Sequence, residues 1–378
     1  MKNILEAKDL KTIRGGSLLV DVPDLGIFEG ETLSIIGPNG AGKTTLLQAL
    51  SFLMKPSAGE ILFRGQAVGA EQRVLEYRRR LAMVFQEPLL FDTTVFGNVA
   101  SGLKIRGIGG AEVRRIVEAQ LERFGIASLR DRSAKTLSGG EAQRASLARA
   151  FAISPEILFL DEPFAALDPP TREAIVTDLE KVLAETKTTT VMATHDRNEA
   201  LRLSNRIAVM EGGRIAQIDR PAVVLNQPVD EFVASFVGTE TILEGQVRDV
   251  NETAMIVGVN ESEIEVVGSA KPDERVVLCI RPENVTLTVA DGNGKPSAQN
   301  VFRGRILRII PLGCFHKVEI ACGFALVAYI TTQALEDLAL REGVEVAAAF
   351  KATAIHVIRK SGLCACSEKP LRKLHKPG

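Results

Sequence analysis

Short apolar runs that end in polar residues recur along the first part of the chain. They lie at residues 33–36 and 157–160 and within the segments 83–88 (MVFQEP) and 191–196 (VMATHD). Such runs predict buried strands of a parallel sheet, whose C-terminal ends share one edge. Residues 44–50, the amphipathic stretch 111–126 and the Ala-rich stretch 136–150 predict helices. Together these elements indicate an α/β fold.

A different pattern begins after Gly238. Short runs rich in Val and Ile, separated by turn residues, predict a β-barrel or β-sandwich. Two pairs of segments in this region resemble each other, namely 244–250 (EGQVRDV) with 303–309 (RGRILRI) and 277–287 (VLCIRPENVTL) with 347–357 (AAAFKATAIHV). The repeat places Arg281 and Lys351 at equivalent positions. Two related small barrels in tandem are the simplest account, and a coincidence of β-type alternation is the alternative.

Composition and charge exclude several classes of function. The formal net charge is -1 with 25% charged residues, and the chain has no tryptophan and two tyrosines, so neither a basic field nor aromatic stacking for nucleic acid is expected. Charges interrupt the N-terminal segment MKNILEAKDLK, which is therefore not a secretory signal. No apolar run approaches the roughly 18 residues of a membrane span. We expect a cytosolic protein that reaches a membrane only through a partner.

The five cysteines, at positions 279, 314, 322, 364 and 366, are scattered, so a disulfide framework is not expected. Cys364 and Cys366 form the one close pair in the sequence, and without a second pair nearby they do not predict a metal site. Residues 361–378 mix Lys, Arg and Pro without apolar periodicity and predict a disordered tail.

Residues 37–44 (GPNGAGKT) follow one of the apolar runs and precede a predicted helix. Gly37, Gly42, Lys43 and Thr44 meet the spacing of a P-loop, in which backbone N–H groups surround the β-phosphate of a nucleotide. Lys43 would bring a positive charge to the β- and γ-phosphate oxygens, and the Thr44 hydroxyl is a suitable Mg²⁺ ligand. A glycine-rich turn of an ordinary α/β unit is the alternative, but the flanking strand and helix favour the nucleotide site.

The polar residues after the other runs supply the remaining chemistry. Asp161 would hold hydrated Mg²⁺, and Glu162 follows it as a candidate general base for the attacking water. His195 is a candidate sensor of the γ-phosphate, and Gln86 could reach Mg²⁺ or the water. Each of the last two, taken singly, could be a structural residue at a strand end. Their convergence on one sheet edge favours the functional interpretation.

Residues 136–150 (TLSGGEAQRASLARA) place two adjacent glycines at a predicted helix start. Ser138 and Glu141 have the spacing of a capping box, which by itself does not require Gly139 and Gly140. Because bare backbone N–H groups at a helix start can bind an anion, this segment is a second candidate phosphate site.

The motifs GPNGAGKT, the Gln86 segment, LSGGE, LFLDEP, ALD (166–168) and His195, in this order, resemble the ATP-binding cassette (ABC) ATPases over residues 1–237. The resemblance implies an α/β P-loop NTPase with a helical subdomain, ATP and Mg²⁺ as cofactors, and a head-to-tail dimer. In such a dimer the LSGGE segment of one copy closes over the γ-phosphate held by the other. The resemblance assigns to the nucleotide Gly37, Pro38, Asn39, Gly40, Ala41, Gly42, Lys43, Thr44, Thr45, Ser138, Gly139, Gly140, Glu141 and Asp168. It assigns to the metal Thr44, Gln86 and Asp161.

Two further features refine this resemblance. Ile13 stands where the family has an aromatic residue that stacks on adenine, and Ile13 offers no π-face. The stretch between Gln86 and Ser138 resembles the small helical subdomain that receives a coupling helix from a membrane subunit. It holds no long coiled coil, and the chain has one cassette, which favours a transporter subunit. Without a spanning segment the permease is a separate chain, and because exporters of this family often fuse the two, the resemblance implies an importer subunit that is peripheral at the cytoplasmic face of the cell membrane.

Residues 297–358 resemble the transport-associated oligonucleotide/oligosaccharide-binding (TOBE) domain of the molybdenum-pterin-binding type. The resemblance is carried by SAQNVFRGRI, KVEI, YITTQALEDLALREG and FKATAIHVI. In that family the domain binds molybdate or tungstate, often between two copies, and the corresponding residues here are Ser297, Thr331 and Lys351. The family has an arginine at the position of Gln299 and a serine at that of Ala334. A domain that only braces a dimer is therefore the alternative.

The sequence thus predicts an ABC ATPase domain at 1–237, a first TOBE-like segment at 238–296 and a second at 297–360. The expected function is ATP hydrolysis coupled to solute import, with molybdate or tungstate as the cargo. Import of another solute, such as sulfate or a sugar, with purely structural barrels is one alternative. A soluble ABC ATPase without a permease is the other.

Overall fold

The computed structural model describes residues 2–69, 71–289 and 298–359. The chain divides into two compact units, Met1–Leu225 and Asn226–Gly378. The predictions for Ser297, for Cys364 and Cys366 and for the tail 361–378 lie outside the described residues.

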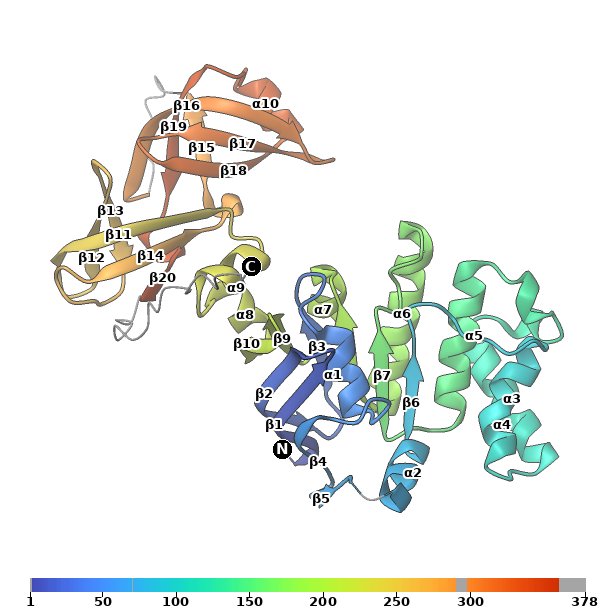
Figure 1. Cartoon of the computed structure of the whole chain (residues 1–378). Coiled ribbons are helices and arrows are strands. Elements are labelled where there is room, and N and C mark those ends of the chain that lie inside the picture. Colours follow the sequence, from blue (N-terminus) through green and yellow to red (C-terminus); the bar gives the residue numbers. More distant parts are fainter. Residues whose placement is uncertain (1, 70, 290–297, 360–378) are drawn as a thin grey trace, which may run out of the picture. The chain divides into compact units, whose positions relative to one another are not determined.

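The first unit contains two sheets (Figure 1). The six-stranded sheet has the order β10-β9-β3-β8-β7-β6 and is parallel except for β10, which runs antiparallel to β9. The antiparallel sheet has the order β2-β1-β4-β5. The strands are β1 (Asn3–Arg14), β2 (Ser17–Phe28), β3 (Thr32–Ile36), β4 (Ala58–Phe63), β5 (Gln66–Ala67), β6 (Leu81–Val84), β7 (Ile157–Asp161), β8 (Thr189–Thr194), β9 (Arg206–Glu211) and β10 (Arg214–Asp219).

The helices of this region include those predicted at 44–50, 111–126 and 136–150, which are α1, α4 and α5. In chain order the helices are α1 (Lys43–Leu50), α2 (Glu71–Arg79), α3 (Val95–Ile105), α4 (Gly110–Arg123), α5 (Gly139–Ala152), α6 (Pro169–Thr186), α7 (Arg197–Leu203) and α8 (Pro221–Asn226), with short 3₁₀ helices η1 (Ala127–Leu129) and η2 (Ala134–Thr136). The apolar runs at 33–36 and 157–160 lie within β3 and β7, as predicted.

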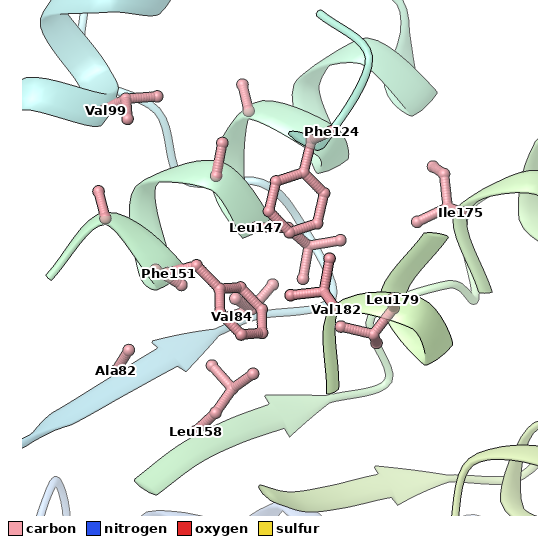
Figure 2. Close-up of a cluster of buried hydrophobic side chains, with 14 of the residues drawn as sticks. Ala82, Val84, Val99, Phe124, Leu147, Phe151, Leu158, Ile175, Leu179 and Val182 are labelled. Atoms are coloured by element: carbon pink, nitrogen blue, oxygen red, sulfur yellow. The ribbon is translucent and has the colours of Figure 1, made fainter. Parts of the chain in front are cut away.

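Two hydrophobic clusters fill the first unit. In one, Leu46 and Leu47 of α1 pack with residues of β1, β2, β3 and β8. The other joins α3, α4, α5 and α6 to β6 and β7, and Figure 2 shows Phe124 and Phe151 near its centre. The rings of these two phenylalanines lie 5.6 Å apart between centroids. Because α1 and α5 belong to different clusters, the P-loop helix and the helix of the LSGGE motif occupy different parts of the unit.

The second unit contains two five-stranded antiparallel sheets with the orders β13-β12-β11-β14-β20 and β15-β19-β16-β17-β18. The strands are β11 (Thr241–Val250), β12 (Ala254–Val259), β13 (Ser262–Val267), β14 (Arg275–Ile280), β15 (Thr286–Val289), β16 (Asn300–Pro311), β17 (Phe315–Ala321), β18 (Ala325–Thr331), β19 (Glu345–Phe350) and β20 (Ile355–Arg359). The helices are α9 (Glu231–Phe236), α10 (Thr332–Asp337), η3 (Pro282–Asn284) and η4 (Ala352–Ala354). The predicted all-β character of this region is confirmed.

The two sheets share one order of strands, as the internal repeat predicts. The first repeat gives the order β13-β12-β11-β14, and the second gives the equivalent order β18-β17-β16-β19. Arg281 and Lys351 precede equivalent 3₁₀ helices, η3 and η4. The fifth strand, however, is exchanged, because β20 pairs with β14 and β15 pairs with β19. Each sheet therefore contains one strand from the other repeat. Alternation of polar and apolar residues fixes the faces of a strand but not its partner.

The predicted cassette, residues 1–237, includes α9. Ala234 of this helix packs with Val277, Cys279 and Ile358 of the neighbouring strands, so α9 lies in the second unit. The domain limits at 237, 296 and 360 stay a prediction.

Two features of the described residues bear on chemistry outside the site. Cys279, Cys314 and Cys322 are free thiols. Burial raises the pKa of the Cys279 thiol to about 12 and that of Cys322 to about 11, which disfavours the thiolate form of both. Within the same described ranges, no helix is long and apolar enough to cross a membrane.

Candidate nucleotide-binding site

Four parallel strands of the first unit, β3, β8, β7 and β6, end at the same edge of the sheet. The register pairs Ile36 at the end of β3 with Thr194 of β8, and Asp161 at the end of β7 with Ala193 of β8. β6 lies on the other side of β7. The segments that carry the predicted site residues follow these strand ends, so residues far apart in the sequence converge here.

The loop between β3 and α1 has a backbone that depends on glycine. Gly40 and Gly42 have φ angles of 81° and 98°, in the left-handed region that favours glycine. At Gly37 a Cβ atom would lie 2.3 Å from the carbonyl oxygen of Met210, so the neighbouring strand excludes a side chain. The Lys43 ammonium is held inside the loop, where it donates to the carbonyl oxygens of Gly37 at 2.9 Å and Pro38 at 3.1 Å.

Thr44 and Asp161 form the next contact of the site. The Thr44 hydroxyl donates to Asp161 Oδ1 at 2.8 Å, and Asp161 is buried. Burial raises the pKa of the Asp161 carboxyl, and the neighbouring charge of Glu162 adds to this, while the Thr44 hydrogen bond and Lys43 oppose it. A bound cation would favour the ionised carboxylate here.

Glu162 stands at the centre of the arrangement. Its φ angle of 44° is unusual for a residue with a side chain, and its backbone N–H donates to the Ala193 carbonyl at 2.9 Å. One carboxylate oxygen, Oε1, lies 3.6 Å from Lys43 Nζ, and the other, Oε2, lies 3.0 Å from His195 Nδ1. Such backbone strain persists where the surrounding contacts fix it, which is common at functional sites.

The donor set of this edge fits Mg²⁺. Thr44 and Asp161 bring a hydroxyl and a carboxylate oxygen to one point beside the P-loop. Oxygen donors of this kind, one or two per protein, bind Mg²⁺ together with the phosphate oxygens of a nucleotide. Gln86, the third predicted ligand, is exposed two residues beyond the end of β6, at the same edge.

Ile13, which stands in place of the family's adenine-stacking residue, is exposed near the end of β1. Leu18 lies directly opposite on β2, and the two apolar side chains are 51% and 49% exposed. They form a small apolar surface on the hairpin.

The start of α5 confirms the predicted capping box. The Ser138 hydroxyl accepts a hydrogen bond from the Glu141 N–H at 3.3 Å, and Glu141 Oε2 accepts one from the Ser138 N–H at 2.7 Å. The bond from the Ser138 backbone lowers the pKa of the Glu141 carboxyl. Packing requires glycine at only one of the two adjacent positions. A Cβ at Gly140 would lie 2.4 Å from Thr171 Cγ2, whereas a Cβ at Gly139 has room.

The structure brings together some of the predicted residues and not others. Lys43, Thr44, Asp161, Glu162 and His195 form one connected group of contacts. The start of α5, with Ser138 to Glu141, lies instead with α3 and α4 in the other hydrophobic cluster. Asp168 caps α6.

Sequence reasoning missed the residues that support this group. Glu199 is buried and accepts a hydrogen bond from the Thr194 hydroxyl at 2.5 Å, and burial raises the pKa of its carboxyl. Arg172 contacts Asp196, the residue after His195. The sequence held one sign of this arrangement, because Asp196 and Glu199 have the spacing of a helix cap. In the structure the Glu199 backbone N–H donates to the Asp196 carboxylate at 3.3 Å.

The candidate oxyanion residues of the second unit lie at opposite ends of one sheet. Thr331 pairs with Phe315 next to the turn after β16, whereas Lys351 follows Phe350, which pairs with Asn300 at the start of β16. The 12 residues of β16 separate these ends by about 40 Å of strand at roughly 3.3 Å per residue. Thr331 accepts the Ala334 N–H at 3.1 Å as the cap of α10.

The surroundings of Lys351 differ in charge from the equivalent place in the other repeat. At the Lys351 end, Gln299 Oε1 accepts the Ala352 N–H at 3.4 Å, and Lys351 makes no ion pair with any residue in the described part of the chain. In the other repeat the counterpart of Gln299 is Glu240, whose carboxylate contacts Lys317 and the Tyr329 hydroxyl.

Known proteins share both parts of this architecture. Residues 20–165 match the family model described as ABC transporter, and residues 296–357 match the TOBE domain. A molybdate/tungstate import ATP-binding protein, WtpC of Pyrococcus horikoshii, is 39% identical over 88% of this chain and 93% of its own length. The chain belongs to the ATP-binding subunits of ABC transporters. The predicted cassette with a C-terminal TOBE region, of the importer type, is thereby confirmed.

Other relatives carry different names at similar identity. A sulfate/thiosulfate import ATP-binding protein, CysA of Mycobacterium bovis, is 37% identical over 87% of this chain and 87% of its own length. A spermidine/putrescine import ATP-binding protein, PotA of Frankia alni, is 36% identical over 83% of this chain and 69% of its own. Among solved structures, the ATP-binding cassette MJ0796, a dimer bound to ADP and Pi, covers 57% of this ABC protein with a TM-score of 0.53 and 30% identity. This ABC protein is an ATPase that binds ATP.

Proposed function

We propose that the cluster around Glu162 is the hydrolytic centre of this ABC ATPase. Glu162 accepts a proton from the water that attacks the γ-phosphate, and His195 donates a hydrogen bond toward the phosphate and holds the Glu162 carboxylate in place. The support is the pair of contacts that fixes both Glu162 oxygens, one from Lys43 and one from His195. A base that is aligned before the substrate arrives loses less freedom at the moment of reaction.

The P-loop and the strand ends hold the nucleotide and its metal in this proposal. The backbone of Gly37, Pro38, Asn39, Gly40, Ala41 and Gly42, with Lys43, Thr44 and Thr45, surrounds the phosphates. Thr44, Asp161 and Gln86 bind Mg²⁺. When bound, Mg²⁺ neutralises the charge of the β- and γ-phosphate oxygens.

The working unit is a head-to-tail dimer of two copies. Ser138, Gly139, Gly140 and Glu141 start a capped helix whose first N–H groups suit an anion, and they lie apart from the P-loop of their own chain. The start of α5 therefore binds the γ-phosphate held by the partner copy, with Asp168 at the same interface. Closure that depends on the γ-phosphate makes the dimer a switch.

A separate permease and a place at the cytoplasmic face of the membrane complete the assembly. The support is the similarity to import ATP-binding proteins, together with the helices α3, α4 and α5, which pack in one hydrophobic cluster.

The cargo that this chain supports best is molybdate or tungstate. The single observation behind this proposal is that the chain is 39% identical to a molybdate/tungstate import ATP-binding protein, over a match that covers 88% of the chain. Hydroxyl and ammonium donors at Thr331 and Lys351 suit a tetrahedral dianion and not a polycation such as spermidine. Sulfate is the second candidate, since a sulfate/thiosulfate import protein is 37% identical over 87% of the chain.

An oxyanion site that uses both Thr331 and Lys351 needs two copies of the chain. Thr331 at the end of β18 and Lys351 after β19 lie at opposite ends of one sheet, so one copy would supply Thr331 and the other Lys351. The ammonium of Lys351 would meet the dianion, and Gln299 and Ala334 would leave the site with one cation and one hydroxyl fewer than the family has.

Calorimetric titration of the full chain tests the cargo. Molybdate, tungstate, sulfate and spermidine are titrated in turn into the wild type, Lys351→Ala and the matched control Lys317→Ala. We expect molybdate and tungstate to bind with micromolar affinity and Lys351→Ala to abolish that binding. Preferential sulfate binding would establish the second candidate, and binding of none would make the TOBE region purely structural.

A pull-down from membranes tests the permease. Co-purification of the chain with a multi-span membrane protein supports the importer assembly. Quantitative recovery of an active ATPase without any membrane protein would favour a soluble ABC ATPase instead.

A further inference from the structure

The first turn of α6 lies between two parts of the candidate site. Asp168 caps the helix by accepting the backbone N–H of Thr171 at 3.1 Å. The Thr171 side chain fills the space beside Gly140, where a Cβ would lie 2.4 Å from Thr171 Cγ2. This turn therefore packs directly against the start of α5.

The loop that carries His195 is fixed on both sides by hydrogen bonds. Before it, the buried Thr194 hydroxyl donates to Glu199 Oε2 at 2.5 Å and accepts the Asp196 N–H at 3.0 Å. After it, Asp196 Oδ1 accepts the Asn198 N–H at 2.8 Å as the cap of α7. The position of Asp196 thus determines where the backbone of His195 lies.

Arg172 joins these two parts through one planar group. Its Nη1 lies 3.5 Å from Asp196 Oδ2, and its Nη2 donates to the Leu167 carbonyl at 3.2 Å. Leu167 directly precedes the Asp168 cap. The two charged side chains are 31% and 26% exposed, so solvent screens their interaction only partly.

We propose that Arg172 is a positioning residue that couples the His195 loop to the start of α6 and, through Thr171, to the start of α5. A shift of His195 at the γ-phosphate moves Asp196, and the guanidinium passes that shift to Leu167 and the Asp168 cap. The chemical centre of one copy is thereby linked to the surface that meets the nucleotide of the other copy. This inference rests on the proposed roles of Glu162, His195 and the dimer.

The geometry requires an arginine at this position. The fork of the guanidinium reaches two acceptors at once, a carboxylate and a carbonyl, whereas a lysine ammonium is a point charge on a flexible stem. Arg172→Lys therefore keeps the charge and loses the link, and Arg172→Met removes both with little change in volume.

Arg202 is a matched control on the same pair of helices. It also joins α7 to α6, through Glu180 at 2.7 Å, Thr177 at 2.8 Å and a contact with Glu173. These contacts lie along the helices and not at the loops. Arg202→Met removes an inter-helix network of at least equal size without touching Asp196 or Leu167.

The test compares steady-state ATP hydrolysis of the full-length wild type, Arg172→Met, Arg172→Lys and Arg202→Met, together with chemical unfolding of each. For Arg172→Met we expect kcat to fall between about tenfold and about 100-fold, as for other residues that orient a catalytic group. KM for ATP stays within about twofold, and Arg172→Lys does not restore kcat. Arg202→Met keeps kcat within about twofold although its midpoint of unfolding falls at least as far.

A double-mutant cycle identifies the path. Asp196→Asn keeps an oxygen to cap α7 and removes the charge that faces Arg172. If Arg172 acts through Asp196, the double variant Arg172→Met/Asp196→Asn loses no more kcat than Arg172→Met alone. Losses that multiply, or an Arg172→Met variant that turns over like Arg202→Met, would overturn the proposal. Failure of the proposed function looks different, because Glu162→Gln and His195→Ala would then keep near-normal turnover.

Discussion

His195 Nδ1 lies 3.0 Å from Glu162 Oε2, although 33 positions separate the two residues in the chain. The contact exists because β7 and β8 are adjacent and parallel, so that the residues after them leave the same edge of the sheet. It fixes the orientation of the carboxylate on one side, while Lys43 lies 3.6 Å from the other oxygen. The proposed base is thus held by two neighbours, one at the start of α1 and one after β8.

Removing the imidazole should release the base. For His195→Ala we expect turnover to fall roughly 100-fold, the usual loss when one stabilising donor leaves a reacting phosphate or oxyanion. ATP affinity should stay within a few-fold, because the P-loop contacts are untouched. Hydrolysis and nucleotide binding are measured side by side, with the exposed neighbour change Arg197→Ala as the control. Unchanged turnover in His195→Ala would remove this residue from the mechanism.

The Thr44 hydroxyl should be needed for the metal and not for the fold. We expect Thr44→Val to lose Mg²⁺-dependent hydrolysis and Thr44→Ser to keep it, since serine retains the oxygen donor beside Asp161. Chelation of Mg²⁺ with EDTA should stop hydrolysis by the wild type, and added Mg²⁺ should restore it. A Thr44→Val variant with wild-type Mg²⁺ dependence would show that this hydroxyl is not a ligand.

The two glycines of the LSGGE motif should differ in their effect on stability. Gly140→Ala places a methyl group against Thr171, so we expect the free energy of unfolding to fall by about 1–3 kcal/mol. Gly139→Ala should change it by no more than about 0.5 kcal/mol. Denaturant unfolding measures both, and Gly140→Ala/Thr171→Ala should recover most of the loss. Equal effects of the two glycine substitutions would contradict the packing account.

Glu199 should make stability depend on pH. Burial raises the pKa of its carboxyl above the ordinary value of 4.5. A folded-state pKa above the unfolded one means that the stability associated with the protonated form is present at low pH and is lost as pH rises through the folded pKa. Glu199→Gln keeps an acceptor for the Thr194 hydroxyl and does not ionise. Its stability relative to the wild type should therefore increase from pH 4.5 upward, and a difference independent of pH would refute the shift.

Much of the fold and of the site could be predicted from the sequence. The apolar run at 157–160 has no polar residue and the run at 33–36 has only Ser34, so the buried strands were evident, and Ser138 and Glu141 gave the capping box directly. The exchange of β15 and β20 could not be predicted, because alternation fixes the faces of a strand but not its partner. The contact of Arg172 with Asp196 and that of Gly140 with Thr171 could not be predicted for a related reason. The residues of each pair become neighbours only when α6 packs on the sheet and on α5.

The hydrolysis rate and ATP affinity of Glu162→Gln, measured on the same preparation, test the central claim most directly. Glutamine keeps the shape of the side chain but is not a base, so we expect turnover to fall by at least about 100-fold while ATP still binds. Glu185→Gln, an exposed glutamate of α6, serves as the control and should hydrolyse ATP like the wild type. Near-normal hydrolysis by Glu162→Gln would contradict the account, since the group at the centre of the proposed site would then have no part in the reaction.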